Sequence, residues 1–250
     1  MAVMSTATHP PLSEDLRELP PDPNLPDDLS RQSLRLLAAL RRHHPPTADH
    51  SIRVATVLLA MWSRRSEALG DAALIVAAGL LHDLGKLFLP VSLLDAARQL
   101  TPLETAAVRE HPRTGSETLS ALGYPEAVVF SARDHHERWQ GGGYPSGRQG
   151  RELMPLVRAV CVADAFVAMI EPGRAYRRHL TVAEALLEVQ ACSGTQFDPG
   201  FAALLVDGLG PTFQAELGLD TVPGERRAVV AGLLPSHLLQ RALRLPPCPW

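Results

Sequence analysis

Side chains that can bind a metal ion recur along this sequence at the ends of, and inside, apolar segments. The clearest pair is His82-Asp83, which follows the apolar run AALIVAAGLL. Asp164 lies inside a second apolar segment, VRAVCVADAFVAMI, where an unpartnered carboxylate costs on the order of several kcal/mol. Asp164 therefore needs a cation, hydrogen-bond donors or a metal ion. The full set of candidate ligands is His50, His82, Asp83, His111, His135, His136 and Asp164.

These residue types point to the chemistry of a pair of divalent ions. Imidazole nitrogens and carboxylate oxygens are ligands that Fe, Mn and Zn accept. One carboxylate can bridge two ions about 3.5–4 Å apart, and such pairs activate water for attack on phosphoryl groups. Asp83 is the natural bridge. The two ligand shells would then be His50, His82 and Asp164 for one ion, and His111, His135 and His136 for the other.

Each of these features also has an interpretation without a metal. A single histidine at a helix end is usually a surface or capping residue, and one His-Asp or His-His pair is a weak signal. Asp164 could instead pair with an arginine, for which Arg133, Arg158 and Arg174 are available. The segment GGGYP on its own is typical of a surface turn. The occurrence of all these features in one chain, in this order, favours the metal centre.

The elements that position the candidate ligands are predicted to be helices. Apolar residues recur at helical spacing in SIRVATVLLAMWSRRSEAL, and TPLETAAVREH begins with the capping pattern of Thr101 and Glu104. Ser30 is expected to cap an earlier helix, which HHPPTADH would break before a new cap at Thr47 or Asp49. His50 and His111 are expected at helix boundaries. No segment alternates like a strand, so the sequence predicts an all-α fold, a compact multi-helix domain.

The length of 250 residues suits one domain of ordinary size. Residues 1–29 are rich in proline and acid and are expected to form a poorly ordered leader. Residues 30–205 are expected to form the folded domain, including an N-terminal helix. Residues 206–250 are expected to form a helical extension of unknown role.

Charge, cysteine content and hydropathy narrow the functional classes. The net charge of −3 predicts no broad affinity for nucleic acid or membrane surfaces. The three cysteines are odd in number and widely spaced, which argues against a disulfide framework. The longest apolar run, residues 72–81, is about half of the roughly 20 residues that span a bilayer, and no secretory signal pattern precedes it. We expect a cytoplasmic protein.

Taken in order, the motifs resemble the HD-GYP subfamily of HD-domain metal-dependent phosphohydrolases. The resemblance spans about residues 47–205. No single motif would suffice, but their combination is highly specific. The segments that carry it are TADHSIRVA, AAGLLHDLGKLFLP, LTPLETAAVREHPRTG, HHERWQGGGYP, RAVCVADAFVAM, RAYRR and GTQFDPG.

The resemblance implies an all-helical domain with a two- or three-ion centre bound by the seven candidate ligands. It also implies hydrolysis of cyclic di-GMP to linear pGpG or GMP, in which a metal-bridging hydroxide attacks phosphorus. Asp83 and Lys86 would be the catalytic residues, and Lys86 would neutralise charge on a substrate phosphate. The remaining substrate contacts implied by the resemblance are Gly143, Tyr144, Pro145, Arg174 and Arg177.

The sequence departs from the family pattern at several positions. Pro46 stands where trinuclear members have a ligand glutamate, so we expect two ions, Fe or Mn, with Zn as an alternative. Gln140 and Val167 stand where aspartate is common. The RPYR segment appears as RAYR, with Ala175, and is displaced by one residue behind Glu171 and a proline. All binuclear ligands survive these changes, so metal binding is better supported than cyclic di-GMP hydrolysis.

Two other functions stay open on the sequence alone. One is an HD phosphohydrolase that acts on another nucleotide. The other is a catalytically silent domain that binds a nucleotide or a signalling partner. The loop that contains Gly141–Pro145 could shape the substrate pocket, dock a partner such as a diguanylate cyclase, or simply form a turn. A homodimer could form through the helix at residues 30–42.

Overall fold

The computed structural model describes residues 29–64, 69–171 and 179–208. Within these ranges the regular structure is helical and no strand is present, which confirms the predicted all-α class. The α-helices are α2 (Leu29–His43), α3 (Pro45–Arg64), α5 (Ala72–Leu81), α6 (Val91–Leu94), α7 (Pro102–Val108), α8 (His111–Ala121), α9 (Glu126–Asp134), α10 (Pro155–Ile170), α11 (Val182–Ala191) and α12 (Pro199–Gly208). Two 3₁₀ helices accompany them, η1 (Leu84–Phe88) and η2 (Gly150–Glu152).

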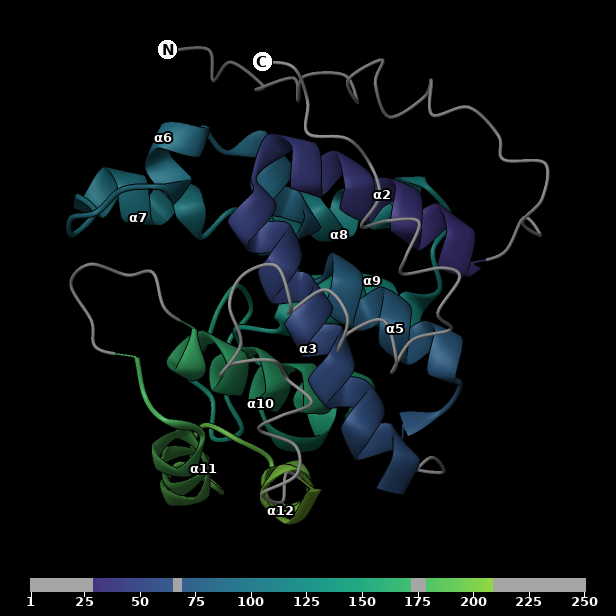
Figure 1. Cartoon of the computed structure of the whole chain (residues 1–250), viewed down its shortest axis with the longest axis vertical. Helices are drawn as coiled ribbons and strands as arrows, with labels where there is room; N and C mark the ends of the chain where they lie inside the picture. The colour runs from purple at the N-terminus through teal and green to yellow at the C-terminus, as the bar shows by residue number, and fades with distance from the viewer. Residues whose placement is uncertain (1–28, 65–68, 172–178, 209–250) are drawn as a thin grey trace, which may run out of the picture.

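Helix α3 runs through the middle of the molecule and contributes to two hydrophobic clusters (Figure 1). One cluster joins the first half of α3 to α2, α5 and α9, and includes the buried Leu40 and Leu80. The other joins the second half of α3 to α10, α11 and α12, and includes the buried Phe166 and Leu205. Because both clusters hold α3 in place, the residues along its first turns are fixed relative to α5 and α10.

The junction of α2 and α3 differs from the sequence expectation. Helix α3 begins at Pro45, not at a cap at Thr47 or Asp49, because proline fits the first turn of a helix, where its missing N–H is not needed. Only His44 separates α3 from α2. As a consequence, His50 lies in the second turn of α3, so the prediction that it marks a helix boundary was wrong. The capping box at Thr101 is confirmed.

Two glycines beside the His-Asp pair let helices approach closely. A Cβ atom on Gly79 would lie 2.5 Å from the Cα of Ala55, so α5 packs directly on α3 at this point. A Cβ on Gly85 would lie 1.9 Å from the carbonyl oxygen of His111, so η1 packs directly on the start of α8. Neither approach is compatible with a side chain. The motif GLLHDLGK therefore fixes His82 and Asp83 between α3 and α8.

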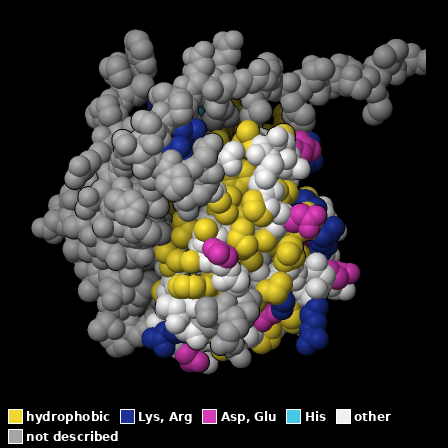
Figure 2. Space-filling view, turned by 90° about the vertical axis from the view of Figure 1, so that its right-hand side faces the viewer, with side chains coloured by type: hydrophobic (Ala, Val, Ile, Leu, Met, Phe, Trp, Pro, Cys, Tyr) yellow, Lys and Arg dark blue, Asp and Glu magenta, His cyan; other side chains and the backbone are white. Residues whose placement is uncertain are grey.

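The described surface is mixed in character. One face shows a broad hydrophobic area with acidic and basic side chains along one edge (Figure 2). No helix in the described ranges combines the length and apolar character needed to cross a bilayer. The expected leader, up to residue 28, and the extension from residue 209 lie outside the described residues, and the expected boundary at residue 206 falls inside α12.

Candidate metal centre

The seven predicted ligands converge where five helices meet. His82, Asp83, His111 and His135 are each at most 3% exposed, so the centre is largely closed to solvent. The contributing elements are α3 (His50), the end of α5 with the residue before η1 (His82, Asp83), the start of α8 (His111), the end of α9 with the turn after it (His135, His136) and α10 (Asp164). Residues far apart in the sequence thus form one cluster of imidazoles and carboxylates.

His50, His82 and Asp164 form what we call the first ligand group. The Nε2 atom of His50 is 2.9 Å from Oδ1 of Asp164, and the Nε2 atom of His82 is 3.8 Å from the same oxygen. Two ligand atoms that bind one ion at about 2.1 Å and at right angles lie roughly 3 Å apart. The spacing in this group is therefore suitable for one ion.

His111, His135 and His136 form the second ligand group, which consists of imidazoles alone. The Nε2 atoms of His111 and His135 are 3.2 Å apart. The ring of His136 lies beside both, with centroids 5.2 Å from that of His111 and 4.1 Å from that of His135. Three nitrogens directed at one point form a suitable site for a second transition-metal ion.

Asp83 lies between the two groups and directs one oxygen toward each. Its Oδ2 is 3.5 Å from Nε2 of His82, while its Oδ1 is 3.2 Å from Nε2 of His111 and 3.8 Å from Nε2 of His135. This is the arrangement expected of a carboxylate that bridges two ions. The geometry therefore agrees with the predicted grouping of the ligands.

Backbone carbonyl groups orient three of the imidazoles. In each case Nδ1 donates a hydrogen bond to the carbonyl oxygen three residues earlier in the chain, which leaves Nε2 with its lone pair directed into the centre. The pairs are His82 with Gly79 (2.9 Å), His111 with Val108 (2.7 Å) and His135 with Ala132 (2.9 Å). A helix end thus sets both the tautomer and the direction of each ligand.

The carboxylates of the centre are ionised despite their burial. Burial opposes the charge on Asp83, but Lys86 and His82 hold its pKa well below the ordinary value. Burial likewise opposes the charge on Asp164, but His50 and His82 lower its pKa. Both aspartates therefore offer negatively charged oxygens at neutral pH, which is the form that binds a metal ion.

One imidazole of the centre, His50, has a much higher affinity for protons than three of the others. Burial lowers the pKa of His136 to about 4 and, together with His136 and His82, lowers that of His135 well below the usual value. Burial also lowers the pKa of His82. Burial acts in the same direction on His50, but hydrogen bonds to Asp164 and Glu171 outweigh it and raise the pKa of His50 to about 10.

The donor set fits divalent metal ions better than it fits a simple polar cluster. Nε2 of His82 is buried and has no hydrogen-bond partner, which is costly unless an ion completes its environment. The arginine alternative does not hold for the two described candidates: Arg133 pairs with Asp134, and Arg158 pairs with Asp198. His50, His82, His111, His135 and His136 would bind such ions with Asp83 and Asp164.

Lys86 lies beside the carboxylate of Asp83. Its Nζ donates to Oδ2 of Asp83 over 2.6 Å, from the position three residues further along the chain. It is the only lysine in the 250-residue sequence. A compact ammonium group is therefore placed next to the metal ligands, where it can face a negatively charged oxygen of a substrate.

The loop that contains Gly141–Pro145, which we call the GYP loop, packs against the second ligand group. The ring of Tyr144 stacks on His136 with centroids 4.7 Å apart, and the guanidinium of Arg109 lies 4.9 Å from the centre of the tyrosine ring. The N–H of Ser146 donates to Oε1 of Glu137 over 2.7 Å. A Cβ on Gly143 would lie 2.5 Å from Cα of Glu137, so this glycine permits the close approach. Pro145 follows Tyr144 through a cis peptide bond.

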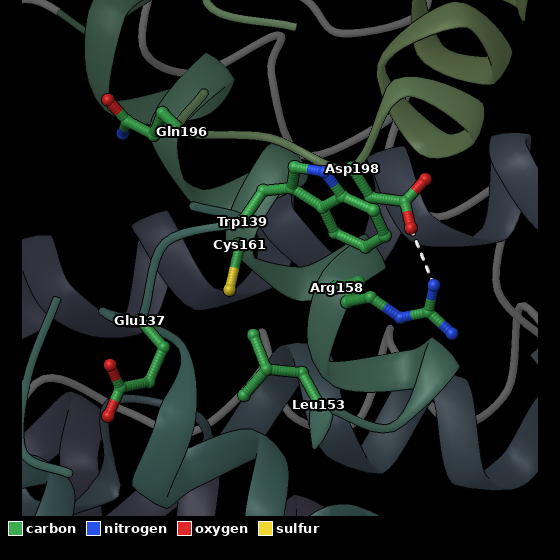
Figure 3. Close-up of a pocket in the computed structure, with 7 residues that line it drawn as sticks. All are labelled: Glu137, Trp139, Leu153, Arg158, Cys161, Gln196 and Asp198. Carbon is green, nitrogen blue, oxygen red and sulfur yellow. Dashed lines mark hydrogen bonds and ion pairs between the residues drawn. The ribbon is translucent and has the colours of Figure 1, made fainter. Parts of the chain in front are cut away.

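A small cavity adjoins this loop but is separate from the metal centre, because none of the seven ligands lines it (Figure 3). One wall carries the ion pair of Arg158 with Asp198, 2.5 Å apart. Glu137 also lines this cavity, so the same residue ties the GYP loop to α9 and faces the cavity. The lining residues are Glu137, Trp139, Leu153, Arg158, Cys161, Gln196 and Asp198.

Sequence reasoning missed three residues near the centre: Glu171, Arg53 and Arg109. Glu171 lies two helical turns after Asp164, so helical spacing could have placed it on the same face. Arg109 gave no such signal, because its neighbour Tyr144 is distant in sequence. The predicted contacts Arg174 and Arg177, with Ala175, lie outside the described residues.

Comparison with known proteins identifies the family. The family model described as "HD domain" matches residues 35–201, about two thirds of the chain. Over 140 residues the chain is 36% identical to the cyclic di-GMP phosphodiesterase response regulator RpfG of Xanthomonas campestris, covering 55% of this chain and 37% of that protein. Over 163 residues it is 36% identical to the 3′3′-cGAMP-specific phosphodiesterase 3 of Vibrio cholerae, covering 64% and 35%.

The solved structures support the same fold. An HDGYP protein from Bdellovibrio bacteriovorus superposes with a TM-score of 0.54 at 18% identity, over 75% of this chain and 74% of that one. The chain spans little more than a third of the length of the two curated relatives above. The resemblance inferred from the motifs is confirmed by the family match, and the chain belongs to the HD-domain family.

Proposed function

We propose that this chain is a metal-dependent phosphodiesterase that hydrolyses cyclic di-GMP to linear pGpG, to GMP, or to both. The observation that carries the proposal is the position of Asp83, with one oxygen toward each ligand group and Lys86 on Oδ2. Two ions bound there, Fe or Mn, with Zn as an alternative, would activate water and polarise a phosphoryl group. The similarity to cyclic dinucleotide phosphodiesterases supports this substrate class.

The side chains around Asp83 have separate roles in this proposal. Asp83 would be the ligand common to both ions. Lys86 neutralises charge that develops on a phosphoryl oxygen in the transition state, because its ammonium is close to the bridging carboxylate. Tyr144, with Gly143 and Pro145 shaping the loop around it, places an aromatic ring beside His136, where it can shape the substrate pocket.

Two departures from the family pattern, Val167 and Gln140, differ in how they could affect the choice of substrate. Val167 is fully buried in the hydrophobic cluster between α3 and α10, so its change from aspartate alters packing and not a surface that a nucleotide could touch. Gln140 is exposed, and its backbone N–H donates to the carbonyl of Thr195. An exposed difference at the base of the GYP loop favours, as a second candidate, hydrolysis of another cyclic dinucleotide.

A substrate panel on one preparation tests the proposal. The protein is purified without oxygen, loaded with Fe²⁺ or Mn²⁺, and its metal content and turnover of cyclic di-GMP, 3′3′-cGAMP and cyclic di-AMP are measured together. Two ions per chain with highest kcat/KM on cyclic di-GMP is the expected result. Highest kcat/KM on another dinucleotide supports the second candidate, and tight binding without turnover supports a silent binding domain.

Matched variants separate chemistry from folding in this assay. Asp83→Asn removes the bridging charge at the centre, whereas Asp95→Asn makes the same chemical change at an exposed site beside His44. Turnover is expected to disappear in the first variant and to persist in the second. Equal turnover in both would contradict the proposed centre.

Two surfaces could contact partner chains: the GYP loop and helix α2. The GYP loop leaves Pro145 and Ser146 exposed, so a signalling partner such as a diguanylate cyclase could bind there. The apolar side of α2, including Leu36, Leu37 and Leu40, is buried in the core, so a homodimer formed through this helix would use its polar side.

A further inference from the structure

His50 is held differently from the other oriented imidazoles of the centre. Backbone carbonyl groups of their own helices or turns fix His82, His111 and His135. The Nδ1 atom of His50 instead donates to a carboxylate oxygen, Oε2 of Glu171, over 2.9 Å. Glu171 lies 121 residues further along the chain, directly after α10. The orientation of His50 therefore depends on a tertiary contact.

Glu171 is itself held by a second side chain of α3. The guanidinium of Arg53 donates to Oε1 of Glu171, the oxygen that His50 does not use. Arg53 lies three residues after His50, so both side chains project from the same face of α3. The side chains of His50, Arg53 and Glu171 are between 11% and 20% exposed, so water competes weakly for these contacts.

We propose that Glu171 is a positioning residue of the first ligand group, an inference that rests on the proposed metal centre. By accepting the Nδ1–H of His50, its carboxylate fixes the ring with Nε2 toward Asp164, and it makes that nitrogen a stronger ligand. Arg53 keeps the carboxylate in place. Glu171 contacts the ligand and not the ion, and it belongs to the first ligand group only.

The neighbouring positions on α10 support this assignment. Val167, one turn before Glu171 on the same side of the helix, is apolar and fully buried, so it offers His50 no acceptor. Asp164, two turns before, already faces Nε2 of His50. Of the described residues on this face of α10, Glu171 supplies the acceptor for Nδ1.

The test compares ion affinities in an isosteric variant. Glu171→Gln keeps the shape of the side chain and removes its charge, and Glu188→Gln makes the same change on the exposed side of α11. Each full-length chain is freed of metal and titrated with Mn²⁺ at pH 8 by calorimetry and electron paramagnetic resonance. We expect Glu171→Gln to weaken the binding of one of the two ions by about 10- to 100-fold and to leave the affinity for the other ion unchanged. Glu188→Gln should match the wild type.

Several outcomes would overturn the inference. Unchanged affinity for both ions, or equal weakening of both, would show that Glu171 has no specific link to the first group. A lower unfolding midpoint in the presence of a chelator, with unchanged ion affinities, would make its role purely structural. A third ion that disappears in Glu171→Gln would make Glu171 a ligand.

The wild-type titration keeps this inference distinct from the proposed function. If the wild-type chain binds no ion at all, the proposed metal centre itself fails. If the wild type binds two ions and Glu171→Gln behaves identically, only the role of Glu171 fails. Arg53→Gln supplies a second check, because it removes the contact that holds Glu171 and should weaken the same ion by a smaller factor.

Discussion

The two ligand groups share Asp83 but are built by different means. The first group contains a carboxylate, Asp164, and a histidine whose orientation depends on the tertiary contact with Glu171. The second contains imidazoles only, and two of them are oriented by carbonyl oxygens three residues earlier. In the first group the placement of His50 therefore depends on contacts between α3 and the C-terminal end of α10, whereas His82 and two imidazoles of the second group are oriented by local backbone geometry.

This difference has an electrostatic consequence. His50 carries a pKa raised to about 10 by its two carboxylate partners, so it holds a proton at neutral pH until an ion displaces it. The pKa of His136 is lowered to about 4 by burial, so its ring is neutral and ready to bind. His50 must therefore give up a proton to bind its ion, whereas His136 need not.

Asp83→Ala is the change with the largest expected effect, because Asp83 is the residue that both groups share. The variant should lose both ions and all measurable turnover. Elemental analysis of the purified protein after loading with Mn²⁺ checks this. Retention of two ions would show that the groups do not depend on a common bridge.

Lys86→Ala should separate ion binding from catalysis. The ammonium contacts Asp83 but is not a ligand, so both groups should keep their ions while turnover falls by about 10²–10³-fold, as for the loss of one charge-stabilising donor. Turnover and metal content are measured on the same sample. An equal fall in metal content would instead assign Lys86 to maintaining the centre.

The pH dependence of ion binding should distinguish the two groups. Between pH 6 and pH 8 the proton on His50 competes with the first ion, so its apparent affinity should rise by about tenfold per pH unit. The slope for the second ion should be smaller, because burial lowers the pKa of His136 to about 4 and that of His135 well below its usual value. Mn²⁺ titrations at three pH values measure both slopes. Equal slopes would contradict the contrast between the groups.

Tyr144→Leu should have the smallest effect and should concern the second group only. The variant removes a ring that stacks on His136 and lies under Arg109, contacts that are each worth about 1 kcal/mol. Because these contacts hold the GYP loop in place beside the substrate pocket, we expect KM to rise by roughly fivefold, the equivalent of about 1 kcal/mol, with the ion count unchanged. Tyr144→Phe keeps the ring and is the matched control. A rise in KM in both variants would implicate the hydroxyl group instead.

The three imidazoles oriented by backbone carbonyls, one in the first ligand group and two in the second, were the easiest ligands to predict from sequence. His82, His111 and His135 stand at the ends of helices whose apolar spacing and capping residues are visible in the sequence. Their orientation follows from the carbonyl three residues earlier, which any such helix end provides. Residue type and local position therefore sufficed, and the grouping around Asp83 agrees with the predicted one.

The support of His50 could not be predicted in the same way. The start of α3 was placed too late because Pro45 was treated as a helix breaker although proline is favoured in the first turn. Glu171 was noted only as part of a displaced motif. Its contact with His50 depends on how α3 and α10 pack, and no local pattern encodes the distance between two side chains 121 residues apart.

The measurement that tests the central claim most directly is electron paramagnetic resonance of the wild-type chain loaded with Mn²⁺. A carboxylate that bridges two ions brings them close enough for their spins to couple. The account predicts two Mn²⁺ ions per chain with a coupled spectrum, which Asp83→Asn abolishes. Two uncoupled ions, or a single bound ion, would contradict the claim that Asp83 joins the two ligand groups into one centre.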